Sequence, residues 1–109
     1  MAIEEQLAVL KQGVETWNKW RDDHPDLKVD LRGTDLSRTN LNGIDFRDAR
    51  LTRVDLRGAS LQDARLARAN LSRATLIGTV LTRVSLKETR LTETIVVDAD
   101  LQDADLSGA

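Results

Sequence analysis

The sequence contains no cysteine, one proline (Pro25), one histidine (His24) and only three aromatic residues, Trp17, Trp20 and Phe46. Because cysteine is absent, the chain forms neither a disulfide framework nor a thiolate metal site. A single histidine also lacks the partners that a catalytic triad or an imidazole metal site requires. We therefore expect no enzymatic activity, no metal, no cofactor and no small-molecule substrate.

Long hydrophobic stretches are also missing, because the apolar runs are only a few residues long. A membrane-spanning helix needs about 20 mostly apolar residues, so we expect no membrane span. The N-terminal segment lacks the basic region and unbroken apolar run of a secretory signal peptide. Together with the absence of cysteine, these patterns favour a cytoplasmic protein.

Neither sign of charge dominates the chain as a whole, since 18 acidic and 16 basic residues give a net charge of −2. The charges are unevenly distributed, however. Residues 47–90 hold ten Arg or Lys against four acids, whereas residues 91–109 hold five acids and no base. The sequence therefore predicts a basic middle and an acidic C-terminal end.

Large apolar residues recur at every fifth position of the chain after residue 30. The sixteen occupants are Leu31, Leu36, Leu41, Phe46, Leu51, Leu56, Leu61, Leu66, Leu71, Leu76, Leu81, Leu86, Leu91, Val96, Leu101 and Leu106. Small residues, mostly Ala, Thr and Val, recur two positions before each of them. A period of five matches neither a helix nor a flat strand, because either would scatter the leucines over all faces.

Three extended residues followed by a two-residue corner account for this period. Side chains two apart on extended backbone point the same way, so the leucine and the small residue before it both face inward. Glycines such as Gly33 and Gly78 fall at the second corner position, where a type II turn requires positive φ. Arginines such as Arg73 and Arg83 fall there too, and we expect those corners to adopt a different turn. Inward threonines (Thr34, for example) need a backbone carbonyl of an adjacent coil as hydrogen-bond acceptor.

The segments Ala69-Asn70-Leu71-Ser72-Arg73 and Ala104-Asp105-Leu106-Ser107-Gly108 resemble the repeats of the pentapeptide-repeat family. The resemblance implies an all-β solenoid, a right-handed quadrilateral β-helix of about four coils, over residues 27–109. It also suggests a cyanobacterial-type protein. Some members of the family mimic duplex DNA and bind type II topoisomerases through a long, strongly acidic surface. From residue 27 onward this chain has twelve acids and thirteen bases, so we expect no such mimicry.

Residues 1–26 have a helical period and form a separate unit, which we expect to be an amphipathic capping helix followed by a linker. One helix over residues 3–21 would place its apolar side chains on a single stripe. The predicted cap residues are Leu7, Leu10, Val14, Trp17 and Trp20. Since the first coil of a solenoid otherwise exposes its core, we expect this helix to cover Leu31, Leu36, Leu41 and Phe46. Docking of the helix to a partner is the alternative.

Two features of the predicted outer surface suggest a contact with another protein. Four apolar residues, Ile77, Val80, Ile95 and Val97, fall on outward positions and stack near one another. No second helix follows the last coil, which would expose residues such as Leu101 and Leu106. The candidate interface is therefore Ile77, Val80, Ile95, Val97, Leu101 and Leu106. A homodimer through this region is one possible use of it, and an unknown protein partner is the other.

The arginine-rich middle of the chain supports an alternative function, the binding of an anionic partner. The basic belt consists of Arg50, Arg53, Arg57, Arg65, Arg68, Arg73, Arg83 and Arg90. These arginines are spread over all four predicted sides, and no exposed aromatic residue accompanies them for base stacking. We therefore expect no nucleic-acid partner, and we favour a rigid, non-enzymatic protein-interaction module.

Overall fold

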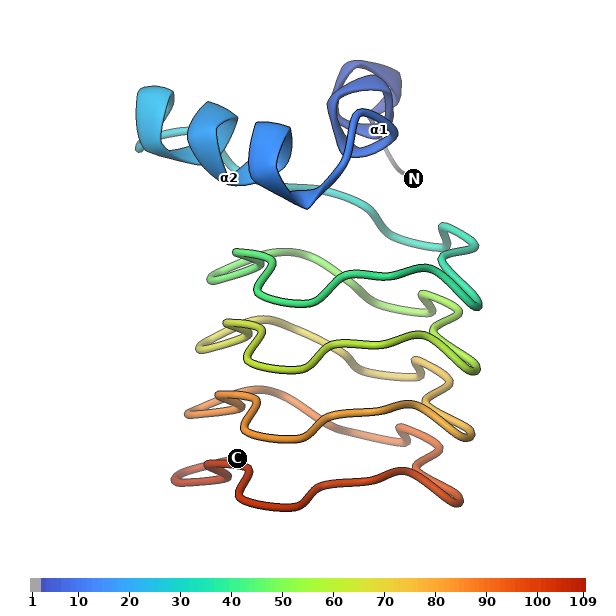
Figure 1. The fold of residues 1–109 in the computed structure, drawn as a ribbon. Coiled ribbons are helices and arrows are strands. Elements are labelled where there is room, and N and C mark those ends of the chain that lie inside the picture. The colour runs from blue at the N-terminus through green and yellow to red at the C-terminus, as the bar shows by residue number, and fades with distance from the viewer. Residues whose placement is uncertain (1–2) are drawn as a thin grey trace.

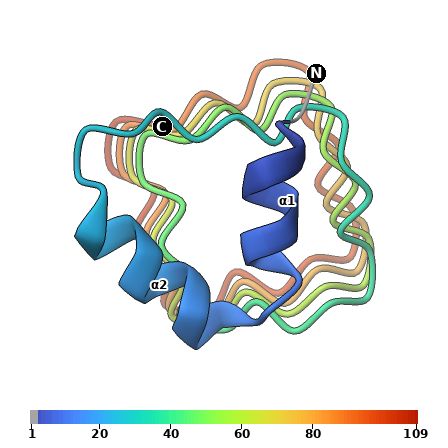
Figure 2. The same cartoon turned by 90° about the horizontal axis from the view of Figure 1, so that it is seen from above.

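The computed structural model describes residues 3–109 and places two helices, α1 (Glu4–Leu10) and α2 (Val14–Asp23), over a stack of coils (Figure 1). Parallel bridges join residues twenty positions apart, as in Asp30 to Arg50 and Arg50 to Asn70. Four five-residue repeats therefore complete each coil, and equivalent repeats stack in columns. Seen down the stack, the coils superimpose as a four-sided outline (Figure 2).

The core of the coils is a column of leucines that is closed to solvent through most of its length. The apolar positions from Leu31 to Leu86 are at most 6% exposed. The small residues two positions earlier, such as Ala59 and Ala69, are fully buried beside them. Each coil contributes one thin apolar layer, so the layers above and below supply the rest of its burial.

Hydrogen bonds between successive coils repeat with the same geometry. The N–H of Asn70 donates to the carbonyl of Ala49 (3.0 Å), and the N–H of Leu51 donates to the carbonyl of Asn70 (2.9 Å). Inward threonines add a third bond. The Oγ1 atoms of Thr79, Thr89 and Thr94 each donate to a leucine carbonyl 23 residues earlier, at 2.7 Å. The predicted acceptor in an adjacent coil is confirmed for these threonines.

The threonines of the first coil depart from this prediction. Thr39 is exposed and donates to the carbonyl of Leu36 in its own turn. The Oγ1 of Thr34 is buried without a hydrogen-bond partner in the described part of the chain. The prediction is wrong for both residues, because no preceding coil lies beside them to provide a leucine carbonyl.

The corners share one backbone conformation whatever residue occupies them. Arg73 and Arg83 have φ of 62° and 56°, close to the 65° of Gly78. The prediction of a different turn at the arginines is therefore wrong. Where the residue before the inward apolar residue is Asp or Asn, its side chain helps to hold the corner: Asn70 Oδ1 accepts the N–H of Ser72, the first corner residue, at 3.0 Å. Such Asx hydrogen bonds help to offset the cost of a left-handed residue, on the order of 1 kcal/mol.

The N-terminal segment forms two helices, so the prediction of one helix over residues 3–21 is wrong. The break occurs at Gly13, whose φ of 106° is incompatible with a continuous helix and begins α2. Leu10 and Trp17 are nevertheless buried against the first coil, and Leu7, Val14 and Trp20 are half-buried around them. The change of direction at Gly13 lets α1 cross the open end while α2 follows one side of it (Figure 2).

Polar side chains of the helices bond to the first coil where a preceding coil would do so. The Nε1 of Trp17 donates to the carbonyl of Asp45 at 2.8 Å, and its ring meets Phe46 edge-on at 5.6 Å. Asn18 Oδ1 accepts the N–H of Asp45 at 2.8 Å. On another side, Gln6 Oε1 accepts the N–H of Asp30 at 2.7 Å.

The Asp45 carboxylate links this end of the coil to α2 through arginines. It accepts two hydrogen bonds from the Arg47 guanidinium, at 2.9 and 2.8 Å, and one from the Arg47 N–H at 3.1 Å, and it lies 3.9 Å from the Arg21 guanidinium. Burial alone would raise the pKa of Asp45, but the hydrogen bonds from Arg47 and the charge of Arg21 outweigh it, so the pKa is lowered. The ionised form is therefore favoured in the folded state.

Enlarging a small inward residue is expected to overpack the core. Ala64 is 1% exposed, so Ala64→Leu should lower the free energy of unfolding by about 1–3 kcal/mol. Ala67→Leu, at a half-buried corner, is the matched control and should change stability far less. Equal melting midpoints for the two variants would contradict the inward assignment of Ala64.

Acid should loosen the contact between α2 and the first coil. Because the folded-state pKa of Asp45 is lowered, its contribution to stability is complete above the unfolded value of about 3.9 and is lost as the pH falls through the folded value. Asp45→Asn should cost about 1–3 kcal/mol near neutral pH and should weaken the acid dependence of chemical denaturation. Asp98→Asn, at an exposed corner, serves as control. Parallel acid profiles for the wild type and Asp45→Asn would refute this role.

Candidate interaction surfaces

The outward apolar residues of the last two coils lie side by side on the surface. Ile77, Ile95 and Val97 are 38%, 48% and 50% exposed. The N–H of Gly78 donates to the carbonyl of Val97, and Ile95 bridges to Thr75, so these residues belong to adjacent strands of the same side. We call Ile77, Ile95 and Val97 the apolar cluster. Contiguous exposed apolar surface of this kind commonly marks a contact with another protein.

Val80 lies around the corner from the apolar cluster and is half-buried. Bridges to Ser60 on one side and Asp100 on the other enclose its backbone. Val80 therefore contributes less exposed apolar surface than its outward position predicts. Val96 contributes more than expected, because it has an inward register and is nevertheless 41% exposed on the last coil.

The corner that carries Val96 and Val97 is less tightly closed than the others. Elsewhere along the coils of residues 30–109, the residue three after each leucine donates its N–H to that leucine's carbonyl, as Ala104 does to Leu101 at 3.0 Å. The corresponding bond from Ala99 to Val96 is absent among the described residues. Sequence reasoning missed this feature.

The last coil presents a second apolar surface that is continuous with the cluster. Leu91 and Leu101 are half-buried, and Leu106 is 45% exposed. On the preceding coil, the N–H of Leu71 donates to the carbonyl of Arg90 on the next coil. The equivalent N–H of Leu91, on the last coil, has no acceptor within residues 3–109. This C-terminal face therefore combines exposed leucines with a free backbone edge, and acids rather than bases surround it.

The basic belt is partly neutralised by ion pairs. Four of its arginines lie beside carboxylates: Arg57 with Asp55 (2.7 Å), Arg68 with Asp48 (2.9 Å), Arg73 with Glu93 (3.5 Å) and Arg83 with Asp63 (2.8 Å). Two of these pairs connect corners of adjacent coils through two hydrogen bonds each. Hydrogen bonding to Arg83 lowers the pKa of Asp63, so this pair stays ionised. The positive charge of these four arginines is therefore partly neutralised, and Arg68, Arg73 and Arg83 each pair with a residue of an adjacent coil.

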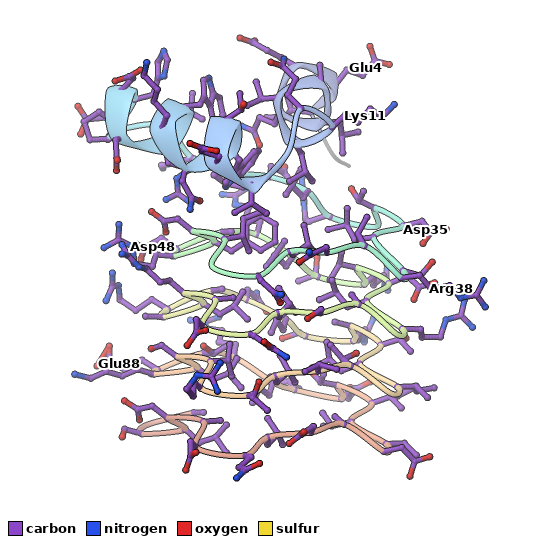
Figure 3. The ribbon with its side chains drawn as sticks, in the orientation of Figure 1. Glu4, Lys11, Asp35, Arg38, Asp48 and Glu88 are labelled. Atoms are coloured by element: carbon purple, nitrogen blue, oxygen red, sulfur yellow. The ribbon has the colours of Figure 1, made fainter. Side chains whose placement is uncertain are left out.

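The remaining belt residues do not converge on one site. Arg50 and Arg90 lie on one side with Asn70 between them, whereas Arg65 lies in a different column, between Asp45 and Ser85. Arg53 occupies a corner with positive φ. Acidic corners interrupt the surface, as Asp48 and Glu88 show on one edge of the stack (Figure 3). Carboxylates therefore interrupt the positive charge of the belt.

The titratable side chains of residues 3–109 do not gather into a metal-type cluster. No group of three His, Asp or Glu side chains in this range has the arrangement to hold a metal ion. The Nδ1–H of His24 donates a hydrogen bond to the carbonyl of Trp20 at 2.9 Å, and the two rings pack at a tilt. Neither α1 nor α2 combines the length and apolar character needed to cross a membrane.

Comparison with known proteins identifies the repeats. A family model described as pentapeptide repeats matches residues 30–68 and 69–108, with eight copies. No match was found among curated proteins.

Solved structures give a second comparison. Two structures of trypsin-treated variants of QnrB1, a plasmid-mediated fluoroquinolone resistance protein, are 32% and 35% identical to this chain, both with a TM-score of 0.68. They cover 74% and 72% of this chain, which spans only 40% and 39% of theirs. The pentapeptide repeat protein Rfr23 from the cyanobacterium Cyanothece 51142 is 28% identical, with a TM-score of 0.45, over 66% of this chain and 60% of its own.

Proposed function

This chain belongs to the pentapeptide-repeat family, and we propose that it is a non-enzymatic protein-interaction module: four coils over residues 27–109, with the N-terminal unit of residues 1–26 as their cap. Its contact surface would be the C-terminal face together with the apolar cluster. The family consists largely of interaction and structural modules, which supports this assignment. We take a second copy of the chain as the first partner to test.

The continuity of two apolar surfaces carries the proposal. Val96, between Ile95 and Val97, joins the outward apolar cluster to the exposed leucine layer of the last coil. The free backbone edge of that coil adds hydrogen-bonding groups to the same surface. A partner that covers this region would bury apolar area and pair the edge in one contact.

Self-association about a two-fold axis would place the acids of both molecules near one another. Residues 91–109 hold five acids and no base, so two copies repel at low salt. Screening by salt should therefore strengthen such a dimer. A complex that used the arginine belt would respond in the opposite way, because salt weakens attraction between opposite charges.

The likeness to QnrB1 supports a shared architecture, and we do not extend its role in fluoroquinolone resistance to this chain. A DNA-like surface requires a dominant negative charge. From residue 27 onward the chain has twelve acids and thirteen bases. Opposite charges also alternate along its corner columns, as in Asp48 and Arg68.

The triple variant Ile77→Arg, Ile95→Arg, Val97→Arg tests the surface by solution mass. The wild type should have about twice the 12.1-kDa chain mass at micromolar concentration, and its dimer fraction should rise with salt. The triple variant should be monomeric, because three buried charges would oppose the contact. Thr52→Arg, Gln62→Arg, Ser72→Arg, with the same charge change at other corners of the stack, should remain dimeric.

Different outcomes locate the error in this proposal. A monomeric wild type at all salt concentrations would exclude self-association. A dimer that persists in the triple variant would remove the apolar cluster from the interface and confine the contact to the leucine layer of the last coil. Dissociation of a wild-type dimer by salt would favour the basic belt instead.

A further inference from the structure

The N-terminal edge of the first coil is only half occupied by the helices. On two of its four sides, the backbone of Asp30 and Asp45 bonds to side chains of Gln6, Asn18 and Trp17. On the two sides between them, the N–H and carbonyl groups of Asp35 and Asn40 have no hydrogen-bond partner within residues 3–109. Two adjacent sides therefore offer a free strand edge.

Later coils show what normally pairs with this edge. The N–H of Asp55 donates to Thr34, and the N–H of Leu36 donates to the carbonyl of Asp55. Ser60 is paired in the same way with Thr39 and Leu41. The complement of each such position is therefore an extended segment that accepts one hydrogen bond and donates another two residues later.

A cavity of about 420 Å³ lies beside the free edge, between the helices and the first coil. Its apolar wall is formed by Leu7, Leu10, Val14, Leu36 and Leu41. Viewed down the stack, α1 crosses the open end and leaves part of one side uncovered (Figure 2). The volume falls within the range of ligand pockets, about 300–1,000 Å³.

The wall of this cavity also includes Thr34, whose buried Oγ1 lacks a hydrogen-bond acceptor. In later coils the acceptor is the carbonyl 23 residues earlier, as for Thr79 and Leu56. The residue 23 positions before Thr34 is Lys11, which is the C-cap of α1 and does not belong to a coil. Figure 3 shows Lys11 on α1 above the segment that carries Asp35 and Arg38.

We propose that this end of the molecule binds an extended segment of a partner polypeptide by strand addition. The segment accepts hydrogen bonds from the N–H groups of Asp35 and Asn40 and donates to their carbonyls. Its aliphatic side chains, five residues apart like the leucines of the coils, enter the cavity above Leu36 and Leu41. This recognition mode combines main-chain hydrogen bonds with side-chain pockets.

Two observations favour a short peptide segment over other occupants. The free groups continue over two sides, which a small apolar molecule cannot pair. The edges at Asp30 and Asp45 are already occupied by helix side chains, so a complete coil of a second molecule does not fit. The site is at the opposite end from the C-terminal face and does not depend on it (Figure 1).

The probe is the peptide acetyl-Val-Asp-Leu-Arg-Gly-Ala-Ser-Leu-amide, which copies residues 54–61, a segment that occupies the same two sides one coil later. At millimolar peptide, amide hydrogen exchange measured by NMR should slow about tenfold at Asp35 and Asn40. Exchange at Asp55 and Ser60, which are already paired, should not change. N-methylation of the first leucine of the peptide removes the donor to Asp35 and should abolish the protection.

Variants of α1 and of the C-terminal face complete the test. Leu7→Trp fills the cavity and should weaken peptide binding at least tenfold, whereas Glu5→Trp, on the exposed side of α1, should not. The triple variant of the apolar cluster should bind the peptide like the wild type. The proposal fails if Asp35 and Asn40 are not protected, if the N-methylated peptide binds equally well, or if protection appears only when two protein molecules associate.

Discussion

Each coil of this molecule depends on the coils beside it, both for its backbone hydrogen bonds and for its apolar burial. The rungs between residues twenty positions apart satisfy the extended backbone, and a single layer of leucines is too thin to exclude water alone. Stacking at a fixed spacing accounts for three features of the coils: the small inward residues, the left-handed corners and the alternating corner charges. Ala64 leaves room for the adjacent corner, and Arg68 reaches Asp48 because the two lie one coil apart.

The two ends of the stack meet this constraint differently. At the N-terminal end, α1 and α2 cover most of the leucine layer, and a few polar side chains replace part of the missing rung. At the C-terminal end, Val96 and Leu106 remain exposed on the last described coil. The C-terminal face and the free edge beside α1 are therefore places where stacking is incomplete, whereas the apolar cluster consists of outward side chains on the last two coils. Three ion pairs of the basic belt connect residues of adjacent coils.

Sequence periodicity predicted the coil architecture, since the five-residue register assigns each residue from Val29 onward to the inside, the outside or a corner. It failed where the structure depends on neighbours that the register does not describe. The left-handed conformation of Arg73 depends partly on a hydrogen bond from the adjacent corner residue to Asn70. Gly13 was read as an interior helix residue, although its positive φ separates α1 from α2. Gln6, Asn18 and Arg21 were overlooked because an apolar stripe says nothing about which polar side chains pair with a strand edge.

Each residue pairs with the one twenty positions later. The number of coils can therefore change without a change in how neighbouring coils pair. Removing or duplicating one whole coil from the middle would preserve the backbone pairing and change the distance between the two ends. Removing a single five-residue repeat would preserve the inward register while turning everything beyond it by one side. The apolar cluster would then face a different direction relative to the cavity under α1. The number of repeats between two remote surfaces thus determines their relative orientation, independently of the residues that form either surface.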